Sequence, residues 1–267
     1  MSLLSQDLSV GSRIGAHRRL AVIFVIVVGL VLSACGGSDD TAGGESDVAV
    51  GIFVDNAFGD GDFFDQAAAA EGTLESDYGA EVATYEAQLE AQNFRPLLQD
   101  AADANDIVFV LGFEAIGEMI TVAEQNQDTV FVFVDAVIDD PNIVSAVFPT
   151  AEGCFMAGAL AATVNVDEAS DVAGFIGGMN APVVENCESG YVQGVAYMNP
   201  AMRVASQYVG SFVDPGKGSE VARVLEGEGA YATFAYAGLS GAGAFDAAKS
   251  GANIAPIGVV ADKSARR

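Results

Sequence analysis

The chain has 267 residues, of which 51% are hydrophobic and 18% charged, a composition typical of an ordered globular protein. The 37 Asp and Glu side chains outnumber the 11 Lys and Arg, and the formal net charge of -26 excludes nucleic-acid binding through neutralised phosphates. A single histidine, His17, and three widely spaced cysteines provide neither a His/Cys metal site nor a His-dependent triad, so we expect no enzyme, no metal and no cofactor.

The first 34 residues have the organisation of a secretory signal peptide. A basic start is followed by an apolar run at residues 20–32, which is shorter than the ~20 residues that span a bilayer. The run ends in LSAC, which resembles the lipobox of bacterial lipoproteins, in which the cysteine takes a diacylglycerol before cleavage. We therefore predict a signal peptide at residues 1–34, a lipid on Cys35 and a flexible tether at residues 35–47, which places the protein on the extracytoplasmic face of the cell membrane. An ordinary signal peptide or a single-pass anchor is the alternative.

Short apolar runs recur from residue 48 onward and are predicted strands. Near-continuous apolar runs of this length suit strands that are buried on both faces. The runs lie at residues 48–54, 106–112, 129–135, 142–148, 171–178, 202–210, 230–237 and 253–260.

Longer Ala-rich amphipathic stretches alternate with these runs and are predicted helices. Strands and helices that alternate at this spacing imply parallel, doubly wound sheets with right-handed crossovers. The helices are expected at residues 62–78, 90–103, 114–126, 152–165, 183–198, 216–227 and 240–250.

The number of strands favours two sheets over one. Residues 143–155 run from a strand into the next helix, and we place the crossing between two lobes there. We therefore expect an N-terminal α/β lobe at residues 48–148 and a C-terminal α/β lobe at residues 149–267. Two lobes that face each other across the carboxyl ends of their strands form a cleft, the usual ligand position in open α/β sheets. A single lobe without a functional cleft is the alternative.

The acidic loop at residues 55–65 follows the first predicted strand and is a candidate binding element. Asp55 offers a carboxylate acceptor at the end of a strand, and Phe63 and Phe64 can form an aromatic wall. A solvated turn that leads into core phenylalanines explains the same residues.

Three further residues are candidates for ligand contacts. Asp135 closes an apolar run at the rim where ligand groups converge, but no spacing pairs it with a second carboxylate as general acid and base. Phe212 lies on the loop before a helix start and either faces the cleft or fills the core of the loop. Asn93 lies near a helix start, where a capping or solvated side chain is the simpler interpretation.

Cys154 and Cys187 both lie in predicted helices. An oxidising compartment permits a disulfide between them, but geometry decides whether it forms. A disulfide and two buried thiols are both compatible with the sequence.

Several of these stretches occur in the order found in one protein family. With them the chain resembles the basic membrane protein family, also called PnrA-like, of substrate-binding lipoproteins that serve ABC importers. The stretches are FGDGDFFD at 58–65, NFRPLL at 93–98, VDAVIDDPNI at 134–143, EGCFMAG at 152–158, GFIGGMNAPVV at 174–184, YVGSFVDPGKG at 208–218 and GAGAFDAAK at 241–249.

The resemblance implies an α/β structure of the type I periplasmic-binding-protein fold, with two doubly wound parallel-sheet lobes that close over a purine nucleoside or a related solute. The residues that match the family's binding residues by position are Asp55, Asn93, Asp135 and Phe212. The stacking aromatic of the first lobe matches Phe63 when the FGD sequences are aligned and Phe64 when residues are counted from Asp55. We prefer Phe63, because that alignment needs no further gap.

Two features depart from the family pattern. The family usually ends its ninth strand with Gly-Val-Asp-Ser-Asp-Gln, whose first Asp binds ribose; Val260 stands at that place here, and Asp262 is a displaced substitute. The family's chain also continues through another crossing strand and closing helices, so we expect the second lobe to be incomplete at residue 267.

We therefore expect a solute-binding lipoprotein that captures a purine nucleoside or a similar neutral solute by lobe closure and delivers it to an ABC permease. A neutral nucleoside avoids the repulsion that an anionic nucleotide meets at this net charge. A sugar or polyol ligand would keep the carboxylates but need less stacking, and a sensor lobe that has lost ligand binding would act through protein contacts. A surface nucleoside hydrolase with Ca²⁺ is disfavoured, because the spacing of oxygen ligands is unconvincing.

Overall fold

The computed structural model describes residues 48–263. The predicted signal peptide, the lipid site at Cys35 and the tether lie outside these residues. Within residues 48–263, none of the helices combines the length and the apolar character that a membrane crossing requires.

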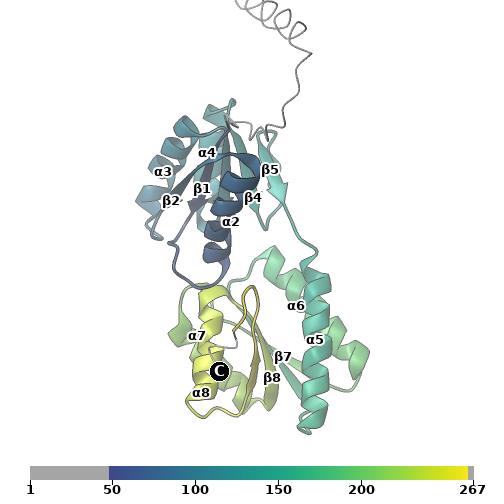
Figure 1. The fold of residues 1–267 in the computed structure, drawn as a ribbon. Coiled ribbons are helices and arrows are strands. Elements are labelled where there is room, and N and C mark those ends of the chain that lie inside the picture. Colours follow the sequence, from purple (N-terminus) through teal and green to yellow (C-terminus); the bar gives the residue numbers. More distant parts are fainter. Residues whose placement is uncertain (1–47, 264–267) are drawn as a thin grey trace, which may run out of the picture. The chain divides into compact units, whose positions relative to one another are not determined.

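Five parallel strands form the first sheet, in the order β2-β1-β3-β4-β5 (Figure 1). The registers align the strand ends, with Val54 opposite Leu111 and Val110 opposite Phe133. Because the strands are parallel, the loops that follow β1, β3 and β4 emerge at one edge of the sheet. The strands are β1 (Ala49–Val54), β2 (Glu81–Glu86), β3 (Ile107–Leu111), β4 (Val130–Val134) and β5 (Ile143–Ala146).

Helices cover both faces of the first sheet. Phe53 belongs to a buried cluster with Leu98 and Met119 of α3 and α4, whereas Ile52 and Val54 belong to the cluster that contacts α2. This alternation follows from the two-residue period of a strand, which sends successive side chains to opposite faces. The helices are α2 (Phe63–Tyr78), α3 (Ala91–Ala104) and α4 (Ile116–Gln125), the last preceded by the 3₁₀ turn η1 (Phe113–Ala115).

The second sheet repeats this arrangement with four parallel strands in the order β7-β6-β8-β9. Phe175 and Phe234 lie in a cluster with residues of α5 and α6, and Ile176 and Ala235 in a cluster with residues of α7 and α8. The elements are α5 (Thr150–Asp167), β6 (Val172–Gly177), α6 (Pro182–Met198), β7 (Arg203–Tyr208), α7 (Pro215–Gly227), β8 (Ala230–Tyr236), η2 (Gly238–Gly241), α8 (Ala242–Lys249) and β9 (Ala255–Ile257).

Helices α5 and α6 pack closely and are joined covalently. Cys154 and Cys187 form a disulfide, with their Cα atoms 5.2 Å apart. The sequence was compatible with a disulfide or with two buried thiols, and the structure contains the disulfide. A Cβ at Gly158 of α5 would overlap the carbonyl oxygen of Tyr191 in α6. The small residue therefore permits the close approach that the disulfide also requires.

The alternating parallel fold with two sheets is confirmed, and two predicted details are wrong. Strand β2 was not predicted, because EVATYE is polar and largely exposed at a sheet edge and the apolar-run criterion does not detect it. The predicted strand at residues 253–260 shortens to Ala255–Ile257; beyond its end, Val260 adopts a left-handed conformation with a φ of 69°, so residue 260 cannot belong to a strand.

Candidate functional site

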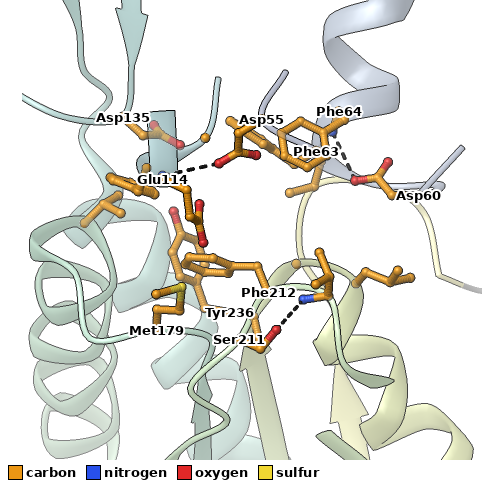
Figure 2. Close-up of a pocket in the computed structure, with 18 of the residues that line it drawn as sticks. Asp55, Asp60, Phe63, Phe64, Glu114, Asp135, Met179, Ser211, Phe212 and Tyr236 are labelled. Atoms are coloured by element: carbon orange, nitrogen blue, oxygen red, sulfur yellow. Dashed lines mark hydrogen bonds between the residues drawn. The ribbon is translucent and has the colours of Figure 1, made fainter. Parts of the chain in front are cut away.

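A cavity of about 210 Å³ lies where the loops at the carboxyl ends of the two sheets meet (Figure 2). From the first sheet, the residues after β1, β3 and β4 line it, and from the second sheet the residues after β7 and β9 and the end of β8. Parallel strands place all of these segments at one edge of each sheet, which is why residues distant in sequence line one space. Its acidic and aromatic lining side chains include Asp55, Phe113, Glu114, Asp135, Phe212 and Tyr236.

Asp55 is the first residue after β1, and the loop after β3 encloses it. It is 2% exposed, and its Oδ2 accepts a hydrogen bond from the backbone N–H of Glu114 at 3.3 Å. A Cβ at Gly112 would overlap the Asp55 carboxyl group, and Gly112 has a φ of 112°, which an L side chain rarely adopts. The structure therefore requires glycine at residue 112 to hold the Asp55 side chain.

Burial raises the pKa of Asp55 to about 9. The adjacent Glu114 carboxyl adds to this rise through a hydrogen bond and through its charge. At neutral pH Asp55 is therefore protonated; its proton is engaged with the Glu114 carboxyl, and its oxygens remain available as acceptors for a ligand.

Asp135 and Tyr236 line the cavity from different sheets. Asp135 follows β4 in a left-handed conformation, with a φ of 75°, and its backbone N–H donates to the carbonyl of Ala146 at 2.9 Å. Burial raises the pKa of Asp135. Burial also raises the pKa of Tyr236 to about 12, and the charge of Asp135 contributes to that rise. The two residues thus provide a carboxyl group and a phenol hydroxyl to the wall of one cavity.

Phe212 stacks on a phenylalanine of the first lobe. Its ring lies 6.2 Å from the ring of Phe113, centroid to centroid, with 24° between the planes. Phe63 and Phe64 also line the cavity, and their rings lie 5.6 Å apart. The first-lobe ring that meets Phe212 directly is thus Phe113, which the sequence reasoning did not single out although it follows a strand end.

The cavity contains most, but not all, of the residues that the sequence singled out. Asp55, Asp135 and Phe212 line it together with both phenylalanines of the first loop. Asn93 does not line it; the Asn93 side-chain amide donates to the carbonyl of Ala87 at 3.2 Å. Asp262 lines a second, separate cavity beside β9, whereas Val260 lines the main one. Val260, which stands at the family's ribose-binding position, thus lines the main cavity, and the turn after β9 leaves Asp262, the candidate substitute, outside it.

The polar lining is acidic. Asp55, Asp60, Glu114 and Asp135 contribute to it, and among the lining residues that the structure describes none is basic. The cavity therefore favours ligands that donate hydrogen bonds and disfavours anions. Within residues 48–263 no group of three or more His, Cys, Asp or Glu side chains is placed to hold a metal ion.

Two doubly wound parallel sheets with a mostly apolar cavity at their facing carboxyl ends define a periplasmic-type solute-binding protein of the type I fold. The family model of the ABC transporter substrate-binding proteins described as PnrA-like matches residues 47–267, and the chain belongs to this family. The members of this family are solute-binding proteins rather than enzymes.

Individual relatives agree with this assignment. The chain is 30% identical to basic membrane protein D of Borreliella burgdorferi over 255 residues, which cover 92% of this chain and 72% of the relative. It is 36% identical over 145 residues to the ABC transporter nucleoside-binding protein BmpA of Lactococcus lactis, covering 54% of this chain and 40% of that protein. The crystal structure of an ABC transporter solute-binding protein from Aeropyrum pernix superposes with a TM-score of 0.70 at 25% identity; the match covers 79% of this chain and 62% of that one.

Proposed function

We propose that this substrate-binding protein captures a purine nucleoside, or a similarly flat and uncharged solute, and presents it to an ABC permease. The observation that carries the proposal is one cavity lined by phenylalanine rings and hydrogen-bonding groups from both sheets. Aromatic faces stabilise a flat base, and carboxyl and phenol oxygens bind its hydroxyl and amino groups. The name of the Lactococcus lactis relative, a nucleoside-binding protein, supports the same ligand class.

The charge of the cavity supports an uncharged ligand. Three acidic side chains besides the protonated Asp55 line it, and the chain as a whole carries a net charge of -26. A phosphate on the ligand would meet this charge without a basic partner among the described lining residues. A nucleoside is therefore expected to bind more tightly than the corresponding nucleotide.

The proposal assigns roles to the aromatic and acidic residues of the cavity. Phe212 and a first-lobe phenylalanine, Phe63 or Phe64, stack on the base, while Asp55 and Asp135 hold hydroxyl or amino groups. Asn93 and Asp262 are assigned no contact with the solute, because neither lines the cavity in this structure. Closure of the lobes gives the permease a form that differs between the empty and the loaded protein. A lipid on Cys35 would keep this protein on the extracytoplasmic face of the membrane, close to the permease.

Isothermal titration calorimetry with adenosine, guanosine, AMP and D-ribose tests the proposal. We expect the nucleosides to bind and Phe212→Ala to weaken them by about 5- to 150-fold, since loss of one stacked base contact costs roughly 1 to 3 kcal/mol. The control Tyr197→Ala removes an aromatic ring that is 74% exposed and does not line the cavity, and it should leave the affinity unchanged.

Three outcomes would contradict the proposal and indicate an alternative. Tighter binding of AMP than of adenosine would refute the charge argument. Binding of D-ribose or other sugars with no effect of Phe212→Ala would identify a polyol-binding protein. If no nucleoside or sugar binds or raises the melting temperature, the protein is better explained as a sensor lobe, a possibility motivated by Val260 on the cavity wall.

A further inference from the structure

One buried ion pair joins the two lobes beside the cavity. The ammonium of Lys263, after β9, lies 3.0 Å from Oδ2 of Asp62, in the loop between β1 and α2. It also donates to the carbonyl oxygen of Gly61 at 3.3 Å. The side chains of Lys263 and Asp62 are only 11% and 5% exposed, in contrast to the other ion pairs among the described residues, which are at least a third exposed.

The turn after β9 directs Lys263 toward the first lobe. The backbone N–H of Ala261 donates to the carbonyl of Val259 at 2.8 Å, and Val260 takes a left-handed conformation, so the chain reverses direction. A Cβ at Gly258 would press into the aliphatic part of Lys263, which shows that the lysine stem lies over this glycine. The strand, the turn and the stem together fix where the ammonium lies.

The loop that receives the ammonium is itself ordered by its own carboxylates. Asp60 accepts hydrogen bonds from the backbone N–H groups of Asp62, Phe64 and Asp65 at 2.9 to 3.1 Å. Asp65 in turn accepts from the N–H groups of Gly59 and Gly61. Because Asp60 and Asp65 are occupied with backbone donors, Asp62 is the carboxylate in this loop that pairs with Lys263.

Both ends of the ion pair lead directly into the cavity wall. Phe63 and Phe64 follow Asp62, and Val259 and Val260 precede Lys263 in its turn; all four line the cavity, whereas neither member of the ion pair does. We propose that Lys263 is a positioning residue that clamps the turn at residues 258–263 onto the loop at residues 58–62 and so holds the two walls closed over the solute. This inference rests on the proposed solute site, but it assigns a role to a residue that does not contact the solute.

The physical reason is the cost of removing the ammonium group that faces a buried carboxylate. When one partner of a buried ion pair is removed, the other keeps its charge in a poorly solvated place, and the structure relaxes by opening to water. Here, opening the clamp separates the turn from the loop, which exposes the solute and speeds its escape. The rate of dissociation is therefore the quantity that should change most.

Lys263→Met tests the clamp, because it removes the charge and keeps the length of the stem. With adenosine as the probe, stopped-flow measurements should show dissociation at least about tenfold faster than in the wild type, with a much smaller change in association. Lys263→Arg, which keeps the charge, should remain within about threefold of the wild type. The control Lys249→Met, at an exposed lysine of α8 that does not line the cavity, should leave both rates unchanged.

A measurement without ligand separates failure of the clamp from failure of the solute site. Amide hydrogen exchange of the free protein should speed up in residues 57–64 of Lys263→Met, and not across the rest of the first sheet. If adenosine does not bind but this local change appears, the proposed ligand is wrong and the clamp stands. Equal exchange in Lys263→Met and Lys249→Met, or a uniform loss of protection over the whole chain, would overturn the clamp.

Discussion

The protonated carboxyl of Asp55 makes a quantitative prediction about stability. Its pKa of about 9 in the folded protein compares with an ordinary value of 3.8, and burial is the main cause. Between these two values the folded protein keeps a proton that the unfolded chain has lost. Folding is therefore coupled to proton uptake, and the free energy of unfolding falls as the pH rises from about 4 to about 9.

Asp55→Asn removes this dependence while it preserves the size of the side chain. One proton of difference changes the free energy of unfolding by about 1.4 kcal/mol per pH unit. From pH 5 to pH 8 the wild type should lose up to about 4 kcal/mol relative to Asp55→Asn, and about 2 kcal/mol if the buried site relaxes or admits water. The free energy of unfolding of Asp55→Asn, relative to that of the wild type, is thus expected to increase steadily with pH.

Urea unfolding at pH 5, 6.5 and 8 measures this difference directly. Apart from Glu114, which interacts with Asp55, the remaining carboxyl groups of this acidic chain behave alike in both proteins, so their contributions cancel in the comparison. Asp128→Asn serves as the control, because Asp128 is exposed and lies outside the cavity, and it should follow the wild type at every pH. If the free energies of unfolding of Asp55→Asn and the wild type change equally from pH 5 to pH 8, the assignment of a protonated Asp55 is refuted.

Two further substitutions test the site and the location of the protein. Gly112→Ala should displace the Asp55 carboxyl and abolish solute binding in calorimetry. The control Gly117→Ala, at an exposed helix position where a Cβ meets no atom, should preserve binding and raise the free energy of unfolding in urea by up to about 1 kcal/mol. Equal behaviour of the two variants would contradict the requirement for glycine beside Asp55. Cys35→Ser should abolish the incorporation of labelled palmitate and release the protein from the membrane fraction, and a variant that stays labelled and membrane-bound would show that Cys35 is not the anchor.

The sequence predicted most of the fold because strands buried on both faces leave a strong signal. The apolar runs at β1, β3 and β4 contain almost no polar residue, and the Ala-rich stretches between such runs are long enough only for helices. Strand β2 was not predicted, because its sequence lacks this apolar signal. Its largely exposed edge position removes the hydrophobic signal, and pairing with β1 together with the packing of Val82 and Tyr85 against the core stabilises it as a strand.

The candidate site was predicted where strand ends determine position. Asp55, Asp135 and Phe212 each follow a strand closely, so the topology alone brings them to one cavity. Asn93 was carried over by family position, and its amide instead contacts the carbonyl of Ala87. Phe113 occupies an equally informative place after β3, and its importance became visible only through its stacking on Phe212.

Taken by itself, the order of apolar runs and helices determined that this chain forms parallel α/β structure with its loops at the carboxyl ends of the strands, and it favoured two sheets over one, because that information is local and periodic. Tertiary structure decided which side chains meet across the lobes, Phe113 with Phe212 and Lys263 with Asp62, and it placed Asp135 where its charge raises the pKa of Tyr236. Such contacts depend on how two separate sheets approach and on single backbone turns, as at Val260, and no spacing along the chain encodes that geometry.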